Sequence, residues 1–363
     1  MTKQFRSLLE KLEEEVMNID VDCADPDVAL AMPFKPHNQT SNQDIITGAL
    51  MNPLYKDLVM ETITKYKSEP WEIIYDRVAV AICKQNIVNI QDRVLLQVSC
   101  HILHDTEAVL THARRYDQFF KEAGIGRDKY CIKIPIVGPS MVAAKILNAE
   151  GIRTLGTSLF GLSQAIAAAQ AGCLMVSPYY NECDAHANRS LWPDVEDPAT
   201  QHPSSFRIIS YLQAYEELYK RTGKEQPKVM SASYITAKEV VASGEIGCWA
   251  VTLPPVLLKE LAETPDDSPP SGIPKPNHPY MHRPSLSKRL AHMVGLDPLA
   301  GKEWEGNQAS LDVDYLADGG AALEEAMKKD AVVLPRLKQA VDLFNGREDE
   351  GKEWILKTLK TLA

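Results

Sequence analysis

Short runs of β-branched and other apolar residues alternate along the chain with longer amphipathic stretches. Runs of this length are typical of buried strands, and amphipathic stretches are typical of helices packed on a sheet. A helical stretch follows most of the runs, which is the order found in α/β proteins with a parallel sheet. The pattern predicts eight strands, at Ile19–Cys23, near Gln39–Asn42, and at Val94–Ser99, Cys131–Pro135, Thr154–Thr157, Cys173–Ser177, Val229–Ser233 and Cys248–Thr252.

The predicted helices begin and end at recognisable residues. Asp105 is a capping candidate for the helix Asp105–Ala123, whose apolar residues fall on one face. Gly172 and Gly244 follow two other helices, in the position where a glycine commonly ends a helix. These other helices are predicted at Ser140–Glu150, Leu162–Ala171, Thr236–Ser243 and Pro254–Ala262.

Repeated strand–helix units predict a single (β/α)8 TIM barrel of the α/β class. The rival is an open doubly wound sheet, which needs a glycine-rich phosphate turn after an early strand, and the sequence has none. We assign residues 18–262 to the barrel core and residues 1–17 to a helix before it. An extended loop region at 263–330 and C-terminal helices at 331–363 follow, all within one domain.

Three segments depart from the repeat. The long polar stretch Tyr179–Ser205 follows the sixth strand, and loops of this length usually cover the site of a barrel. The stretch Thr264–His282 is rich in proline and charge, which predicts an extended surface loop. In the tail, helices are predicted at Val333–Phe344 and Gly351–Leu362.

Composition narrows the function classes. The 363 residues carry 39 basic and 49 acidic side chains, a net charge of -10, without a run rich in Lys or Arg, which argues against a nucleic-acid-binding protein. No apolar run is long enough to span a membrane. Seven scattered cysteines and the absence of a signal peptide predict a reducing, cytoplasmic setting. His101 and His104 come closest to a metal-ligand pair, but they begin a helix or loop, and no metal is expected.

One lysine lies inside the predicted fourth strand. Lys133 is flanked by Cys131, Ile132, Ile134 and Pro135, and a charged ammonium is costly to bury among such residues. Desolvation lowers the pKa of a lysine, and the neutral amine can then attack a carbonyl and form a Schiff base. The alternative is an edge-strand lysine with its amine in water. The barrel order of the elements favours the buried position.

Polar residues stand at the carboxyl ends of the predicted strands, where the chemistry of such barrels lies. Schiff-base chemistry needs a group that shuttles protons through a water, a carboxylate near the reacting hydroxyl, and polar groups that orient the carbonyl chain. Taken singly, each candidate has an ordinary alternative as a cap, a turn residue or a packed hydroxyl. The candidates around Lys133 are Asp22 or Asp25, Asn42, Gln97 and Ser99, Thr157, Ser177 and Tyr179, and Ser233.

The chain resembles the transaldolase family in several stretches. They are FKPHNQTSNQ (34–43), DTEA (105–108), CIKIP (131–135), the block from Gly151 to Tyr179, VMSASY (229–234) and LPPVLLKELAE (253–263). The resemblance implies a (β/α)8 barrel that transfers a three-carbon dihydroxyacetone unit between sugar phosphates. It implies a lysine Schiff base with neither a metal nor an organic cofactor, and it suggests a homodimer.

The resemblance implies a role for each matched residue. Lys133 falls on the Schiff-base lysine and Thr157 on the threonine that holds the catalytic water. Asn42 and Ser177 fall on residues that bind the hydroxyl end of the substrate, and Ser233 falls on a serine at the phosphate side. The acid of the first strand is open between Asp22 and Asp25. We prefer Asp22, because it is nearer the end of the apolar run.

Several positions depart from the family pattern. Gln97 replaces the glutamate that helps to activate the water, Leu155 replaces an asparagine, and Tyr179 replaces a phenylalanine. Glu182 and Ile235 stand where the family has two phosphate-binding arginines. Loss of an arginine that grips two phosphate oxygens opposes a phosphorylated substrate by roughly 2–5 kcal/mol for each disrupted contact.

The departures leave three functions open. Gln97 and Tyr179 together resemble the fructose-6-phosphate aldolase subgroup, in which aldol addition or cleavage is favoured over transfer. The chain is then either an ordinary transaldolase of the pentose phosphate pathway or an altered, biosynthetic aldolase that acts on a carbonyl compound without phosphate. A catalytically silent barrel with a binding role is the third. Arg189 or Arg283 would restore a phosphate site if either lay at the rim of the pocket.

Overall fold

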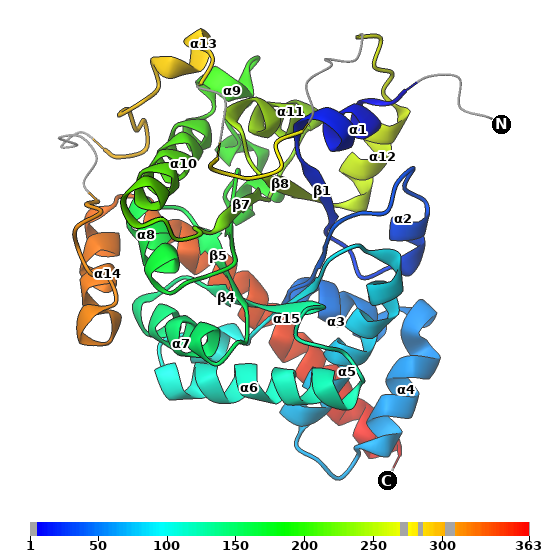
Figure 1. Cartoon of the computed structure of the whole chain (residues 1–363). Coiled ribbons are helices and arrows are strands. Elements are labelled where there is room, and N and C mark those ends of the chain that lie inside the picture. The colour runs from blue at the N-terminus through cyan, green and yellow to red at the C-terminus, as the bar shows by residue number, and fades with distance from the viewer. Residues whose placement is uncertain (1–5, 269–274, 282–285, 302–308, 363) are drawn as a thin grey trace.

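A closed barrel of eight parallel strands forms the centre of the molecule (Figure 1). The computed structural model describes residues 6–268, 275–281, 286–301 and 309–362. The strands follow one another around the ring in chain order, and the first pairs with the last. This confirms the predicted TIM barrel and all eight strands, with shifts only at their ends. They are β1 (Asn18–Val21), β2 (Gln39–Thr40), β3 (Val94–Gln97), β4 (Tyr130–Pro135), β5 (Thr154–Leu159), β6 (Met175–Pro178), β7 (Lys228–Ser231) and β8 (Ala250–Leu253).

Helices surround the barrel. Those predicted after the third, fourth, fifth, seventh and eighth strands are confirmed, although the helix after the seventh continues through Gly244 and ends at Gly247, which has the left-handed φ of 96°. The ring also contains helices that the sequence pattern did not reveal. The helices are α1 (Leu8–Lys11), α2 (Pro26–Leu30), α3 (Gln43–Met51), α4 (Lys56–Lys65), α5 (Trp71–Asn86), α6 (Thr106–Glu122), α7 (Gly138–Ala149), α8 (Leu162–Gln170), α9 (Pro198–Gln201), α10 (Pro203–Thr222), α11 (Ala237–Ile246), α12 (Pro255–Glu263), α13 (Lys288–Ala291), α14 (Ala317–Lys329) and α15 (Val333–Thr361). Shorter helical turns are η1 (Leu12–Val16), η2 (Pro53–Tyr55), η3 (Ile87–Asn89), η4 (Cys100–Ile102), η5 (Cys183–His186) and η6 (Arg189–Leu191).

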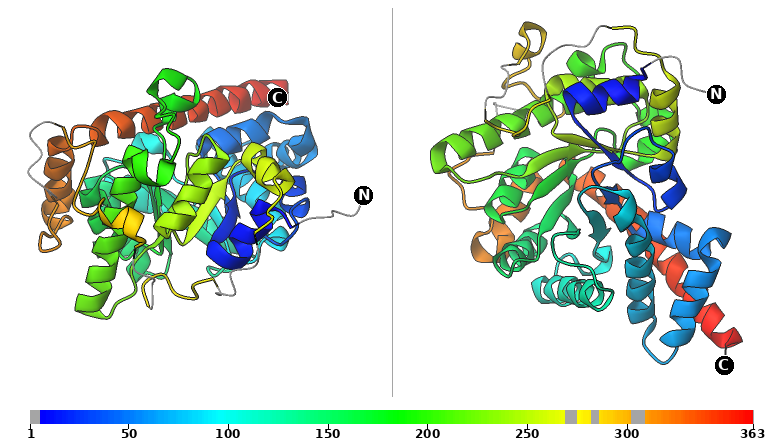
Figure 2. Two further views of the ribbon diagram at one scale, coloured as in Figure 1. Left: turned by 90° about the horizontal axis from the view of Figure 1, so that it is seen from above. Right: turned by 45° about the vertical axis from the view of Figure 1, so that its right-hand side comes forward.

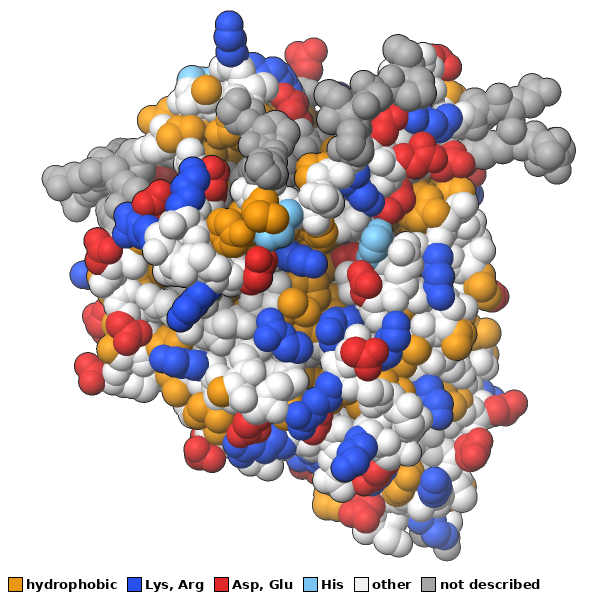
Figure 3. Space-filling view, viewed as in Figure 1, with side chains coloured by type: hydrophobic (Ala, Val, Ile, Leu, Met, Phe, Trp, Pro, Cys, Tyr) orange, Lys and Arg blue, Asp and Glu red, His pale blue; other side chains and the backbone are white. Residues whose placement is uncertain are grey.

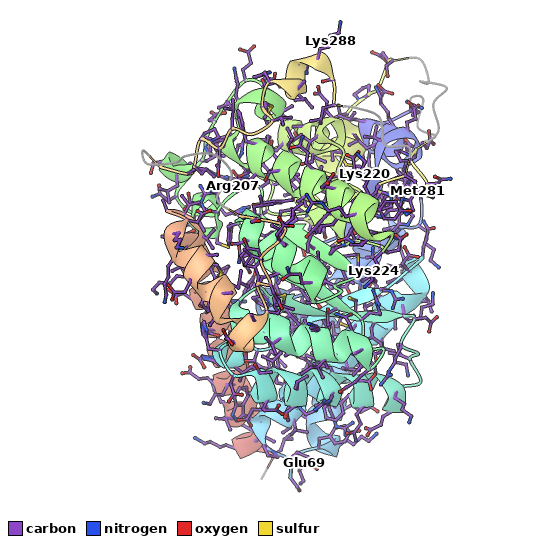
Figure 4. All side chains as sticks on the ribbon, turned by 60° about the vertical axis from the view of Figure 1, so that its left-hand side comes forward. Glu69, Arg207, Lys220, Lys224, Met281 and Lys288 are labelled. Atoms are coloured by element: carbon purple, nitrogen blue, oxygen red, sulfur yellow. The ribbon has the colours of Figure 1, made fainter. Side chains whose placement is uncertain are left out.

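The main core lies between the strands and the helices. On α6, the predicted apolar face is buried, and its Phe120 ring stacks on Tyr130 of β4 with centroids 4.2 Å apart. At the side of the barrel, the buried Arg207 of α10 forms ion pairs with Asp297 at 3.0 Å and Asp330 at 2.9 Å (Figure 4). These contacts attach the segments before and after α14 to the barrel wall.

The predicted extended region 263–330 is only partly an extended loop. Residues 269–274, 282–285 and 302–308 lie outside the described part of the chain, and so does Arg283. The described part includes the short α13 and the longer α14. On α14, Leu323 and Met327 are one helical turn apart and both are buried, because the helix packs against α7 and α8. The high content of proline and charge elsewhere in the region concealed this amphipathic helix.

The prediction of two helices in the tail is wrong. The structure has the single helix α15, which continues through residues 345–350. Its buried residues Phe344, Glu348, Gly351 and Ile355 recur every three or four positions, so one face stays against the protein throughout. Gly351 is an interior packing position rather than a helix start, because a Cβ there would lie 2.8 Å from the ring of Tyr75.

The helix α15 crosses the carboxyl-terminal end of the barrel. It contacts η4 after β3, η5 after β6, and β5 itself, and the two views of Figure 2 show it running along one side of the molecule. Thr47 of α3 donates a hydrogen bond to the carbonyl of Arg347 at 2.8 Å. The opposite face, seen in Figure 3, carries intermixed acidic and basic side chains. The end of the barrel where chemistry is expected is therefore the end that α15 covers.

Candidate active site

Two layers of side chains fill the barrel interior. Because side chains alternate along a strand, residues two positions apart face the same way. An apolar layer consists of Leu95, Cys131, Leu155, Met175, Met230 and Ala250. Two positions later on β3 to β6 stand Gln97, Lys133, Thr157 and Ser177, all buried. The structure thus gathers four predicted site residues in one layer, next to the carboxyl ends of the strands, and places Leu155 in the apolar layer beneath them.

The amine of Lys133 is held away from water. The residue is only 3 % exposed, and burial lowers its pKa, while the charge of Asp22 opposes this shift most strongly, ahead of Cys100 and Cys183. The described residues provide no hydrogen bond or ion pair to its Nζ atom. A buried amine with a lowered pKa and an unengaged lone pair is suited to attack a carbonyl carbon.

The two acids proposed for the first strand have different surroundings. Asp22 follows β1 directly, and its carboxylate accepts a hydrogen bond from the hydroxyl of Thr40. It is the acid whose charge acts on Lys133. Asp25 instead is the N-cap of α2 and accepts a hydrogen bond from the backbone N–H of Asp27 at 3.0 Å. The geometry favours Asp22 as the acid of the site.

Gln97 ends β3 and is the register partner of Lys133. Its Nε2 donates a hydrogen bond to Oε1 of Gln43 at 2.6 Å and lies 3.5 Å from the sulfur of Cys100. Its Oε1 is buried and has no hydrogen-bond partner among the described residues. This oxygen can accept a hydrogen bond from a water or a substrate hydroxyl, but a neutral amide cannot take up a proton at pH 7.

On the side of β4 away from β3 stand three residues with hydroxyl groups, Thr157, Ser177 and Tyr179. Thr157 Oγ1 donates to the phenolic oxygen of Tyr179 at a long 3.5 Å. Burial raises the pKa of Tyr179 well above its ordinary value, so the phenol stays protonated. Ser177 Oγ, also buried, has no partner among the described residues. The layer of Lys133 therefore contains neutral donors and acceptors, and the carboxylate that acts on the amine is that of Asp22.

The comparisons with known proteins fit this arrangement. A family model described as Transaldolase/Fructose-6-phosphate aldolase matches residues 22–319. A transaldolase from Nostoc punctiforme (strain ATCC 29133 / PCC 73102) is 34% identical over 273 residues, which cover 71% of this chain and 77% of that protein. The chain belongs to the transaldolase family. A transaldolase from Synechocystis sp. (strain ATCC 27184 / PCC 6803 / Kazusa) is 29% identical over 355 residues, with 93% of this chain and 83% of that protein covered. The chain is thus a transaldolase-like enzyme.

Two further predicted site residues of this chain, Asn42 and Ser233, have local structural roles. Asn42 is the N-cap of α3, and its Oδ1 accepts a hydrogen bond from the backbone N–H of Ile45 at 3.0 Å. Its amide NH2 remains able to donate. Ser233 has a left-handed φ of 65°, and its hydroxyl donates to Asn181 O at 2.8 Å. Since that bond uses the hydroxyl proton, Nε2 of His186, 2.8 Å away, carries its own proton and donates to Ser233.

The departure at Glu182 has an unexpected partner. Its carboxylate accepts a hydrogen bond from Gln339 at 2.7 Å and lies 3.5 Å from the guanidinium of Arg336, both on α15. The side chains of Glu182 and Arg336 are 16% and 14% exposed. The reversed charge is therefore neutralised across the barrel mouth. Ile235 is half-buried and provides no cation.

Sequence reasoning missed three residues near the site. Arg336 lies beyond residue 319, where the family match ends, so no family position could indicate it. Gln43 ends the stretch FKPHNQTSNQ that resembles the family, and only the fold places its side chain against Gln97. Cys183 lies in the loop Tyr179–Ser205 and is the weakest of the groups that oppose the lowering of the Lys133 pKa, so part of that loop does approach the amine. Arg189 of the same loop is exposed, 5.7 Å from the ring of Trp192.

The described residues contain no group of three or more His, Cys, Asp or Glu placed to hold a metal ion. His101 is 3.4 Å from Asp349 of α15, and His104 is exposed. Within the described ranges, no helix is both long and apolar enough to traverse a bilayer.

Proposed function

We propose that this transaldolase-family enzyme makes or breaks C–C bonds through a Schiff base on Lys133, by transferring or cleaving a dihydroxyacetone-type ketol unit. The observation that carries the proposal is the buried, unpaired amine of Lys133, in one layer with Gln97, Thr157 and Ser177. Asp22 is the charged group that acts on it most strongly. No metal or organic cofactor is needed for this chemistry.

The proposed reaction begins when the neutral amine of Lys133 attacks the ketone carbon of the substrate. The resulting carbinolamine loses water and becomes an iminium ion. Asp22 accepts the proton of the hydroxyl group next to the bond that breaks, and the bonding electrons flow into the iminium to give an enamine. The enamine then attacks a second aldehyde in transfer, or is protonated and hydrolysed in cleavage. Thr157, Gln97 and Tyr179 are assigned to the water, and Asn42 and Ser177 to the hydroxyl end of the substrate.

Borohydride trapping tests the proposal. Dihydroxyacetone is added to the protein, the mixture is reduced, and the mass of the peptide that contains Lys133 is measured. We expect a reduced three-carbon adduct on Lys133 and none in a Lys133→Met variant. An unmodified Lys133 in the wild-type protein would contradict the enzyme and support a catalytically silent barrel with a binding role.

A specific observation favours a substrate without phosphate. Neither Glu182 nor Ile235 can bind a phosphate group, and Arg336 is already engaged with Glu182. Ser233 is tied to Asn181 and His186 instead of being available as a free donor. We infer that the enzyme is an altered aldolase for a non-phosphorylated carbonyl or sugar substrate. An ordinary transaldolase of the pentose phosphate pathway is the alternative.

The two versions differ in one assay. Sedoheptulose 7-phosphate with glyceraldehyde 3-phosphate is compared with the corresponding sugars without phosphate. We expect the phosphate-free pair to give the higher kcat/KM. Fast transfer with the phosphorylated pair would contradict the altered aldolase and support the pentose phosphate enzyme.

The remaining proposals concern the setting of the enzyme. The cysteines are free thiols in the structure, which agrees with the proposed reducing cytoplasm. The homodimer suggested by the family is a proposal that sedimentation of the purified chain would test.

A further inference from the structure

The side chain of Gln43 lies between α3 and the end of β3. Gln43 is the first residue of α3 and is only 2 % exposed. Its Nε2 donates to two backbone carbonyl oxygens, Gln97 O at 3.2 Å and Val98 O at 2.9 Å. Carbonyl oxygens can only accept hydrogen bonds, so the NH2 group of Gln43 must face them. The orientation of this amide is therefore determined by the backbone.

The orientation of Gln43 determines that of Gln97. Oε1 of Gln43 can only accept, so the group that faces it at 2.6 Å must be the NH2 of Gln97. The oxygen of Gln97 is then the atom left buried without a partner among the described residues. A side-chain amide alone has two nearly equivalent orientations. Gln43 selects the one that leaves the oxygen of Gln97 as the acceptor without a partner, on a side chain whose strand neighbour is Lys133.

We propose that Gln43 is a positioning residue that holds the oxygen of Gln97, rather than its NH2 group, toward the carbon bound to Lys133. The proposal rests on the Schiff-base chemistry proposed above. When the iminium is hydrolysed, the oxygen of a water bonds to the iminium carbon, and the C=N π electrons move to the nitrogen of Lys133. The water proton goes to the carboxylate of Asp22. Gln97 Oε1 accepts a hydrogen bond from the other O–H of the water and so directs its lone pair at the carbon.

The opposite orientation would hinder the same step. An NH2 group would donate to the water and occupy the lone pair that has to attack. Gln97 stands where the family has a glutamate, and an amide cannot take up a proton from the water. Because Gln97 can act on the water only through a hydrogen bond, the orientation of its amide is important. The expected role of Gln43 is thus to set the rates at which the Lys133 adduct forms and decays, without a change in its stability.

Adduct decay provides the readout. Protein loaded with dihydroxyacetone is diluted, samples are reduced with borohydride at intervals, and the adduct on the Lys133 peptide is measured by mass. In Gln43→Met we expect formation and decay both to be slower by about tenfold, the scale of one hydrogen bond lost from the transition state. The equilibrium amount of adduct should stay at the wild-type level, which loss of structure would not produce.

Two variants control the experiment. In Gln43→Glu one carboxyl oxygen still accepts from the NH2 of Gln97. The buried acid faces the carbonyl oxygens of Gln97 and Val98, which favour its protonated form, and its O–H then donates to one of them, so we expect decay near the wild-type rate. Thr47→Val removes a buried hydroxyl on the same helix, where Thr47 contacts Tyr75 at 3.0 Å and not Gln97, and should also leave the rate unchanged. If Gln43→Met does not fold, Gln43→Asn, which is too short to reach Gln97, replaces it with the same expected slowing.

The outcomes separate the two proposals. Wild-type decay in Gln43→Met, or equal slowing in Thr47→Val or Gln43→Glu, would overturn the positioning role and leave the Schiff-base function standing. A wild-type protein that forms no adduct would overturn the function, and the positioning role with it.

Discussion

At the scale of single residues, the buried amine of Lys133 weakens the folded state. Burial lowers its pKa in the folded protein, so below the ordinary lysine pKa the unfolded chain binds more protons, and stability falls as the pH falls. We expect Lys133→Met to raise the free energy of unfolding by about 1–2 kcal/mol at pH 7, as is common when an active-site residue is replaced by one that packs better. Urea unfolding of both proteins measures this.

The gain should shrink as the pH approaches the ordinary lysine pKa, because the unfolded state then also holds a neutral amine. Lys224→Met, at an exposed position (Figure 4), is the control and should change stability little at either pH. A Lys133→Met protein that is less stable than the wild type would show that the amine makes a stabilising contact.

A second residue-scale prediction concerns Gln97→Glu. The new carboxyl would be buried and would face Oε1 of Gln43, an acceptor, at the position of the 2.6 Å hydrogen bond. Both effects favour the protonated acid, so the pKa of the introduced glutamate should lie above its ordinary value. As the pH rises through that pKa, the carboxylate becomes able to take a proton from the water, and kcat/KM should rise. A pH profile without this added rise, compared with the wild type, would contradict the orientation of Gln43.

The sequence predicted which residues lie in the site better than it predicted which side chains they contact. Lys133 could be located because a lysine in a buried strand is unusual, and the burial is confirmed. The pair of Asp22 and Asp25 stayed open, since only the geometry of α2 shows that Asp25 is a helix cap. The contact of Glu182 with Arg336 joins residues 154 positions apart, and such contacts follow from the packing of α15 rather than from a local motif.

At the scale of elements, two glycines of α15 make a matched test. Gly346 is exposed in the middle of the helix, where a Cβ would meet open space, whereas a Cβ on Gly351 would lie 2.8 Å from Tyr75 and 2.9 Å from Thr47 Oγ1. We expect Gly346→Ala to stabilise the protein by about 0.5–1 kcal/mol through helix propensity. Gly351→Ala should destabilise it by about 1–3 kcal/mol through overpacking. Thermal unfolding measures both, and equal shifts would contradict close packing of α15 on the barrel.

The elements that the sequence predicted share one property. Central parallel strands are buried on both faces, so they stand out as apolar runs, and all eight were found. Helices α3 to α5 were not predicted. All three lie between β2 and β3, where a simple strand–helix alternation has only one helix. The break predicted in α15 reflects the polar run at 345–350, which in the structure continues the helix and buries Glu348 on its inner face.

At the scale of the whole molecule, net charge and local charge act together on the substrate. The chain has a net charge of -10, and at the barrel mouth Glu182 cancels the charge of Arg336. A phosphorylated sugar would therefore be repelled by the net negative charge of the protein. The guanidinium of Arg336 would not offset this repulsion, because Glu182 already neutralises it. A neutral sugar is indifferent to both charges. The proposed preference for a phosphate-free substrate therefore rests on the net charge of the molecule as well as on the site.

Salt dependence tests this preference. Ions screen repulsion over roughly 10 Å at 0.1 M salt, so kcat/KM for a phosphorylated ketose should rise with added KCl, by about two- to tenfold, because screening removes an unfavourable steering field. The value for the unphosphorylated sugar should stay constant. In Glu182→Gln, which frees the charge of Arg336, the phosphorylated substrate should improve and its dependence on salt should weaken or reverse. If kcat/KM of the wild-type protein for the sugar phosphate falls with salt, a cation of the mouth binds the phosphate, and the altered-aldolase proposal is wrong.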